Sequence, residues 1–147
     1  VVRDLIVDRT RMFDAIEIFS CWNDVDCKNT ILSDFNIISA READRAINYI
    51  GCMMCGACLE ACPQINSRSP YVGAFVFSQA MALNLVPSGL DRGHDRISAS
   101  MQRGGLADCG ASGNCSEVCP AGIDLPSAIS EFGYIAGRYS LRSFLRG

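Results

Sequence analysis

Two short cysteine-rich segments constrain the fold of this chain more than any other feature. The first reads CMMCGACLEACP (residues 52–63) and the second reads CGASGNCSEVCP (residues 109–120). In both segments the key positions are separated by two, two and three residues, and a Pro follows the last Cys. The segments match at each of these positions except one, because Ser112 stands where the first segment has Cys55. The chain therefore contains a short internal repeat built around seven of its nine cysteines.

The composition is that of a globular domain in a reducing compartment. A length of 147 residues suffices for one domain with its own core. Closely spaced cysteines suit a metal better than disulfides between distant loops. The net charge of −3 gives no indication of nucleic-acid binding. No apolar stretch is long enough to cross a bilayer, and the charged residues near the start do not fit a signal peptide.

The apolar spacing predicts a mostly helical chain with no strands. Residues 2–19 repeat apolar side chains at three- and four-residue intervals, with Val2, Leu5, Ile6, Met12, Phe13, Ile16 and Phe19 on one face. A loop is expected over residues 20–36. We expect one domain over residues 1–147, with a leading helix and loop (1–36) before a two-cluster core (37–147).

Local start and stop signals predict the remaining helices. Ser39 and Glu42 form a capping-box pattern for a helix that carries Ile47 and Ile50 and ends at Gly51. Residues 71–86 read as a buried helix stopped by Pro87, and 88–95 (SGLDRGHD) as a loop. A short helix is expected over about 94–102. The last helix is expected to start at the N-cap Asp124 and to carry Ile129, Phe132, Ile135 and Tyr139.

The spacing of the two segments predicts a pair of iron–sulfur clusters. Two-residue gaps let three sulfurs of one turn converge, whereas the Cys three residues further on cannot join that turn. In two-cluster ferredoxins of this pattern, the fourth Cys of each run binds the other cluster. Site one would then consist of Cys52, Cys55, Cys58 and Cys119. Site two would consist of Cys62, Cys109 and Cys115, with Ser112 facing its remaining corner.

Ser112 decides what site two can bind. A Ser hydroxyl is a far poorer iron ligand than a thiolate, because its proton is harder to remove. The expectation is a 4Fe–4S cluster in site one and a 3Fe–4S cluster in site two, with different reduction potentials. Two alternatives stay open: Ser112 could bind a full cubane through oxygen, or both sites could hold zinc.

The other candidate residues receive structural interpretations. Cys21 and Cys27 match neither segment and read as buried or free thiols in a loop. His94 lies in a charged stretch and is expected to be solvated. A basic stripe at the end of the last helix suits the negative end of the helix dipole; it consists of Arg138, Arg142 and Arg146.

The chain resembles the C-terminal domain of the iron–sulfur subunit of succinate dehydrogenase/fumarate reductase. The resemblance rests on VVRDLIVDR (1–9), on the first Cys segment and on GGLADCGASGNCSEVCPAGIDLPSAI (104–129), and it covers nearly the whole chain. The Gly-Gly-x-Ala-Asp-Cys lead-in and Ser112 are most similar to the Gram-positive, menaquinone-linked type. The resemblance implies an alpha-helical ferredoxin domain with two interleaved cluster loops, and it assigns the same ligands as the spacing.

The resemblance also implies a function in a complex. The chain would relay electrons through 4Fe–4S and 3Fe–4S clusters to or from quinone, with no turnover by itself. Its partners would be a flavoprotein with FAD, membrane anchor subunits that could carry haem b, and a segment holding a 2Fe–2S cluster. That segment precedes this domain in the family and is absent from this sequence. The location implied is the cytoplasmic face of a bacterial membrane or, alternatively, the matrix side of the mitochondrial inner membrane.

Two positions depart from the ubiquinone-linked members of that family. Ser67 and Gly110 stand where those members have a Trp and a His at the quinone pocket, which argues against a ubiquinone-type site. Candidate quinone contacts near site two are Pro63, Gln64, Ile65 and Arg68. The alternative function is a paired-cluster relay of the heterodisulfide reductase or glycolate/lactate oxidase type, although those proteins generally keep the Cys that Ser112 replaces.

Overall fold

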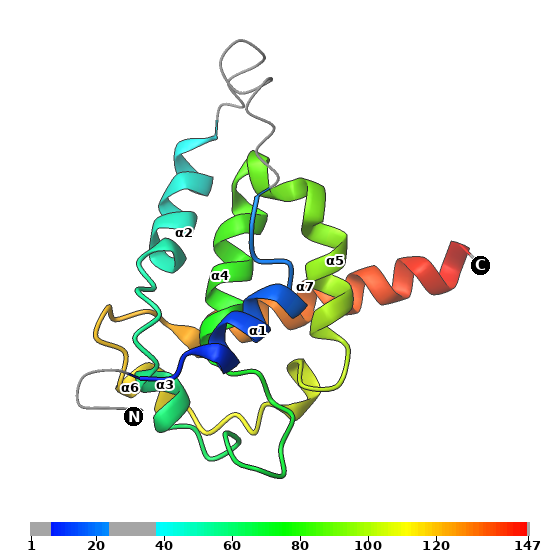
Figure 1. Ribbon diagram of the computed structural model, residues 1–147. Helices are drawn as coiled ribbons and strands as arrows, with labels where there is room; N and C mark the ends of the chain where they lie inside the picture. The colour runs from blue at the N-terminus through cyan, green and yellow to red at the C-terminus, as the bar shows by residue number, and fades with distance from the viewer. Residues whose placement is uncertain (1–6, 24–37, 147) are drawn as a thin grey trace.

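A computed structural model describes residues 7–23 and 38–146, and within these ranges the chain is helical with no strand (Figure 1). The prediction of a mostly α fold is confirmed. Most of the predicted loop at 20–36 lies outside the described residues, as does Cys27. The elements are α1 (Thr10–Ile18), α2 (Ala40–Ile50), α3 (Ala57–Glu60), α4 (Ala74–Leu85), the 3₁₀-helix η1 (Pro87–Arg92), α5 (Gly93–Ser100), the 3₁₀-helix η2 (Leu106–Asp108), α6 (Asn114–Glu117) and α7 (Leu125–Arg146).

Helix α4 forms the centre of the core. It packs against α2 and α7, and its middle is buried on every side. The Phe77 ring makes edge contacts with Phe19 and Phe132, at centroid distances of 5.3 and 5.8 Å. The buried Ser78 hydroxyl donates to the Tyr49 carbonyl at 3.1 Å, so its polar group is satisfied. Aromatic packing thus joins the end of α1 and the middle of α7 to the same residue of α4.

Most of the local helix signals in the sequence are confirmed. The Glu42 N–H donates to Ser39 Oγ at 3.3 Å, and the Ser39 N–H donates to Glu42 Oε2 at 3.2 Å, which completes the capping box. Asp124 accepts from the Ser127 N–H at 3.1 Å at the start of α7. Helix α4 ends at Leu85, two residues before Pro87. These signals act within one turn of the chain, so they can be read without knowing the tertiary structure.

The prediction of one amphipathic helix over residues 2–19 was only partly right. Within the described residues the helix begins at Thr10, and residues 7–9 are not helical. Met12, Ala15 and Phe19 are buried at three- and four-residue spacing. Phe13, expected on the same face, is 59% exposed, because it lies one residue, about 100° of rotation, from Met12. Ile47 and Ile50 of α2 are likewise exposed.

The predicted loop at 88–95 was wrong, since η1 and the start of α5 occupy it. The side chain of Arg96, which is fully buried, holds this segment against the core. Its guanidinium donates to the Gly89 carbonyl at 2.6 Å and to Asn84 Oδ1 at 2.7 Å, and its Nε donates to the Ser20 carbonyl at 3.2 Å. These contacts join segments that are distant in the sequence, so no local pattern could predict them.

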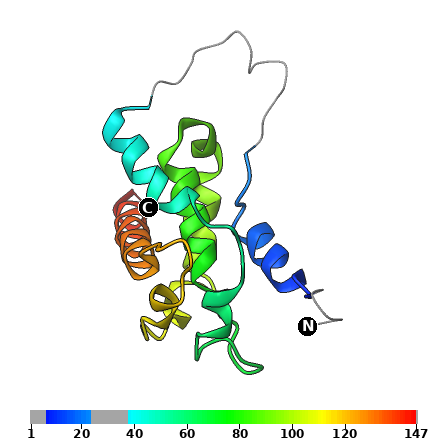
Figure 2. The same cartoon turned by 90° about the vertical axis from the view of Figure 1, so that its left-hand side faces the viewer.

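The two Cys segments lie together at one end of the molecule. Helices α3 and α6 pack against each other there, near the N-terminal end of α4 (Figures 1 and 2). At the opposite side, the C-terminal part of α7 extends away from the body (Figure 1). Among the described residues, none of the helices has the length and apolar character needed to span a bilayer.

Candidate metal centre

The sequence repeat is also a repeat of backbone conformation. The third residue of each segment has positive φ, which is 53° at Met54 and 50° at Ala111. The fifth residue is a left-handed Gly, with φ of 85° at Gly56 and 78° at Gly113. Positive φ is uncommon for residues other than Gly. Its occurrence at matching positions shows that both segments adopt the same unusual turn.

Matching hydrogen bonds continue the repeat beyond the turn. The Leu59 N–H donates to the Gly56 carbonyl at 2.9 Å, and the Ser116 N–H donates to the Gly113 carbonyl at 3.0 Å. A four-residue helix follows each Gly, as α3 and as α6. The Asn114 amide also donates to the Ala61 carbonyl at 3.0 Å, which holds one segment against the other. These short helices were not predicted, because four residues are too few for a periodic pattern.

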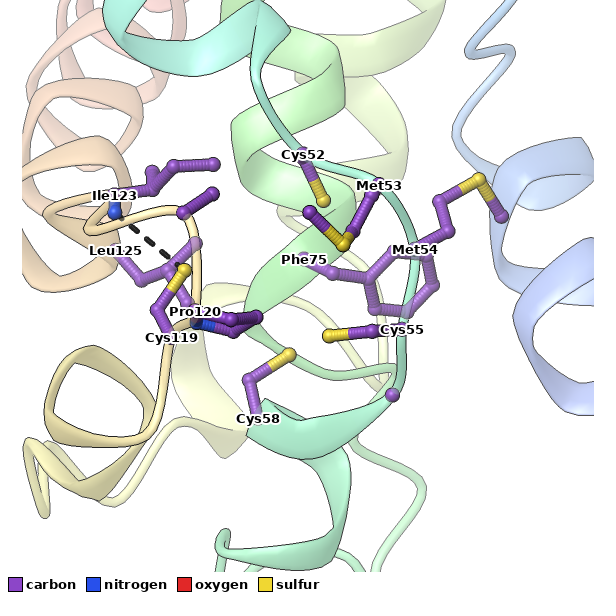
Figure 3. Close-up of a pocket in the computed structure, with 12 residues that line it drawn as sticks. Cys52, Met53, Met54, Cys55, Cys58, Phe75, Cys119, Pro120, Ile123 and Leu125 are labelled. Carbon is purple, nitrogen blue, oxygen red and sulfur yellow. Dashed lines mark hydrogen bonds between the residues drawn. The ribbon is translucent and has the colours of Figure 1, made fainter.

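Site one is a cavity with four thiols on its wall. The Cys52, Cys55 and Cys58 sulfurs come from the first segment and the Cys119 sulfur from the second, and all four point toward a common space (Figure 3). The space between the lining side chains is about 360 Å³, including a mouth open to solvent. The structure thus brings together the four residues assigned to site one.

The surroundings of site one affect the charge of two of its sulfurs in opposite directions. Burial, and next the neighbouring Cys52 sulfur, raise the pKa of Cys58 to about 11. Metal binding must therefore release a proton from this thiol. The Ile123 N–H donates to Cys119 Sγ at 3.4 Å, drawn as the dashed line in Figure 3. Such a bond stabilises negative charge on the sulfur.

Site two is a second cavity, and its wall carries three thiols and the Ser112 hydroxyl at the place of a fourth ligand. Cys62 comes from the first segment, whereas Cys109, Ser112 and Cys115 come from the second. The space is about 530 Å³, again including its opening to solvent. Burial raises the pKa of Cys115. The four residues assigned to site two are thus brought together, with Ser112 at the position equivalent to Cys55.

One stretch of chain forms a wall shared by both sites. Phe75 lines site one, whereas Tyr71 and Ala74 line site two. This stretch leads into α4 through Gly73, and no side chain caps the α4 N-terminus. The positive end of the helix dipole therefore lies beside both groups of thiols, where it favours negative charge.

The donors at both sites fit iron–sulfur clusters. Four thiols suit a 4Fe–4S cluster, and three thiols offer one ligand fewer. Within residues 7–23 and 38–146, no group of three or more His, Cys, Asp or Glu side chains is arranged to hold a single metal ion. A structural zinc site would need four such ligands around one ion. The Cys spacing, with a Pro after the last Cys of each segment, favours clusters over zinc.

The four candidate quinone residues follow Cys62 of site two in the chain but do not line that site. Gln64 packs over Gly110, where an added Cβ would come within 2.6 Å of Gln64 Nε2. The loop that carries them is shaped by Asn66, whose side-chain oxygen accepts from the Arg68 N–H at 2.9 Å. Asn66 was not predicted from the sequence, although an Asn in a polar loop is a common turn former. Neither cavity wall includes any of the four candidates, which are Pro63, Gln64, Ile65 and Arg68.

The remaining candidates lie outside both sites. The Cys21 thiol is half-buried and free, 3.7 Å from the Phe19 carbonyl oxygen, and burial raises its pKa to about 12. His94 is exposed, with its ring 5.2 Å from the Tyr139 ring. Arg138 and Arg142 are exposed on α7. None of these residues lines either cavity.

Comparison with known proteins agrees with this geometry. Residues 48–123 match the family model described as a 4Fe-4S dicluster domain. Over 144 residues the chain is 39% identical to the succinate dehydrogenase iron-sulfur subunit of Bacillus subtilis (strain 168), covering 98% of this chain and 56% of that protein. It is 28% identical over 132 residues to the fumarate reductase iron-sulfur subunit of Escherichia coli O6:H1, covering 89% and 53%.

A third relative matches along almost the whole chain at lower identity. The fumarate reductase iron-sulfur subunit of Mycobacterium tuberculosis is 25% identical over 146 residues, covering 99% of this chain and 58% of that protein. The chain thus spans little more than half the length of each of these three relatives. The family model covers both Cys segments and the helices between them. The chain therefore belongs to the family of 4Fe-4S dicluster domains.

Proposed function

We propose that this chain belongs to the iron–sulfur subunit of a succinate:quinone or quinol:fumarate oxidoreductase and serves electron transfer between a flavoprotein and quinone. The observation that carries the proposal is the pair of adjacent cavities with unequal donors, each lined from both Cys segments. The similarity to a succinate dehydrogenase iron-sulfur subunit over 98% of the chain supports the assignment to this type of complex.

The unequal donors favour unequal clusters. Four thiols in site one suit a 4Fe–4S cluster, whereas Ser112 leaves site two with three thiols, which suits a 3Fe–4S cluster. When bound, such clusters accept and release single electrons at potentials set by their type, charge, hydrogen bonds and exposure. Oxygen ligation by Ser112 is the alternative for site two.

The chain's own residues would hold the clusters and shape their surroundings. The ligand cysteines sit on two turns tied together by the Asn114 amide, so the two sites keep a fixed relation to each other. Phe75 and Leu125 cover site one with apolar surface and limit the access of water. The Ile123 N–H stabilises negative charge on Cys119. These are the properties that a fixed electron carrier requires.

The surface of the chain is consistent with a subunit of a complex. Helix α7 ends in large apolar side chains that are well exposed: Leu141, Phe144 and Leu145. Exposed apolar groups clustered on one element are typical of protein contacts. We propose a flavoprotein, membrane anchor subunits and a segment with a 2Fe–2S cluster as partners, a place on the cytoplasmic face of a bacterial membrane, and menaquinone as the quinone.

We further propose that residues 1–147 fold as one domain. Met12 and Phe19 of the leading segment belong to the same apolar core as Phe77 of α4 and Phe132 of α7. A leading helix with its own separate core would not share these contacts. The packing supports a single unit within the described residues.

The subunits that copurify test this function directly. We would isolate the complex through a tagged copy of the full-length subunit, identify its partners by mass spectrometry, and record EPR spectra before and after adding succinate. We expect a flavoprotein and a membrane anchor in the complex, and cluster signals that respond to succinate. Partners of the heterodisulfide reductase or glycolate/lactate oxidase type would favour the alternative relay, and a colourless zinc protein would contradict both.

A further inference from the structure

The hydroxyl of Tyr71 is buried beside site two with no hydrogen-bond partner. Tyr71 is 1% exposed, and its side chain lines the cavity together with Cys62, Cys109 and Cys115. Within the described part of the chain, its oxygen is one of two buried side-chain N or O atoms without a hydrogen bond. An unsatisfied buried donor destabilises the folded state, so its presence calls for an explanation.

The position of Tyr71 is fixed by the contacts that its other atoms make. Its carbonyl accepts from Arg11 Nη2 at 2.9 Å, and its N–H donates to Ser69 Oγ at 3.2 Å. Its ring stacks against Phe77, with centroids 6.4 Å apart and an interplanar angle of 21°. The ring is therefore held between the core and the cavity and has little freedom to seek another acceptor.

The Cys109 sulfur lines the same cavity as this hydroxyl and interacts with it electrostatically. The phenol of Tyr has a pKa of about 10 in water, so Tyr71 keeps its proton at physiological pH. A neutral phenol beside a thiolate can only donate its hydrogen bond toward the sulfur.

Site one contains no equivalent group. Apart from its cysteines, its wall consists of Met, Gly, Phe, Pro, Ala, Ile and Leu, none of which has a side-chain N–H or O–H donor. Tyr71 therefore distinguishes the two sites by hydrogen bonding as well as by the number of thiols.

We propose that Tyr71 is a positioning residue that donates a hydrogen bond to the Cys109 thiolate and raises the reduction potential of site two relative to site one. The inference rests on the proposed function, because it needs a cluster in site two. Reduction adds negative charge to the sulfurs, and a hydrogen-bond donor stabilises that charge. Removing the donor should therefore make reduction less favourable.

The test is a redox titration of both clusters by EPR in the whole complex. Tyr71→Phe removes one oxygen and keeps the ring stacked on Phe77. We expect the reduction equilibrium of site two to weaken about tenfold, which is about 59 mV toward negative potential for one electron. Site one and the iron content should not change. Tyr139→Phe, which removes a hydroxyl distant in the fold, is the matched control and should leave both potentials unchanged.

A second measurement needs no substitution at Tyr71. Incorporating fluorotyrosine makes each phenol a stronger donor, so the potential of site two should rise while that of site one stays constant. An unchanged reduction potential of site two, in the variant or in the fluorinated protein, would overturn this inference and leave the proposed function intact. If the wild-type complex contains no iron, the proposed function fails as well, so the two failures are distinguishable.

Discussion

Ser112 occupies in the second loop the place that Cys55 occupies in the first. The residues before them, Met54 and Ala111, have φ of 53° and 50°, and the glycines after them have φ of 85° and 78°. The backbone is thus ready for a fourth ligand at both sites, and only the side chain differs. We propose that the identity of the second cluster depends on one atom, oxygen in place of sulfur.

The first prediction concerns that atom. Ser112→Cys should supply the missing thiolate, let site two take up a fourth iron and lower its potential. EPR of the oxidised complex should show a 3Fe signal in the wild type and none in the variant. Ser112→Ala is the matched control and should keep the 3Fe signal. Identical spectra of the wild type and Ser112→Cys would mean that position 112 does not face the cluster.

The second prediction concerns the exchange of ligands between loops. Because Cys119 lines site one and Cys62 lines site two, each substitution should damage the cluster held mainly by the other segment. Cys119→Ala should alter the 4Fe–4S signal and Cys62→Ala the 3Fe–4S signal. Cys21→Ala, which touches neither cavity, should change neither. If each variant damaged the cluster of its own segment instead, the ligand assignment would be wrong.

The third prediction concerns the stability provided by Arg96. Arg96→Met removes the donors to the buried Gly89 carbonyl and to the half-buried oxygens of Asn84 and Ser20. We expect the free energy of unfolding to fall by about 3 kcal/mol. Urea denaturation of the purified full-length subunit measures this loss. The exposed Arg103→Met is the control and should change stability by less than about 0.5 kcal/mol; an equal effect of both variants would contradict the role of Arg96.

The fourth prediction concerns the Cys21 thiol. Because burial raises its pKa to about 12, from 9.0 in the absence of the fold, Cys21 should stay protonated and resist iodoacetamide at pH 8 until the protein unfolds. The unfolded chain loses this proton at lower pH than the folded chain, so the contribution of Cys21 to stability is present below pH 9 and falls as the pH rises toward 12. Mass spectrometry after alkylation, with and without urea, checks the first part. Rapid labelling of native Cys21 would show that the thiol is accessible.

The fifth prediction concerns quinone. If Arg68 contributes to a quinone site next to site two, Arg68→Ala should raise the KM for quinone in the complex and leave the EPR signals of both clusters intact. Arg41→Ala, an exposed arginine on α2, is the control. Unchanged quinone kinetics would remove Arg68 from the candidate residues.

The sequence predicts best what depends on neighbouring residues. The capping box of Ser39 and Glu42, the N-cap Asp124 and the break before Pro87 each act within a turn or two, and each was confirmed. The Cys spacing likewise states a local geometry, because a two-residue gap limits where the sulfurs can lie. Assigning each Cys to one of the two clusters required a general rule about ferredoxins in addition to the spacing.

Features that arise from tertiary packing could not be predicted. The burial of Arg96 depends on acceptors contributed by Ser20 and Gly89, which no periodicity connects. Phe13 has the residue type of a core position, but the helix rotation set by Met12 and Phe19 turns it outward. Tyr71 reads from the sequence as the start of a helix, and only its place in the fold puts its hydroxyl beside Cys109.

Quantifying iron and acid-labile sulfide in the purified full-length subunit, alongside EPR, tests the central claim most directly. Subtracting the contribution of any 2Fe–2S cluster, we expect about seven iron atoms and about eight sulfides for this domain, with a 3Fe signal in the oxidised state. Stoichiometric zinc, or about eight iron atoms in two identical cubanes, would contradict the account.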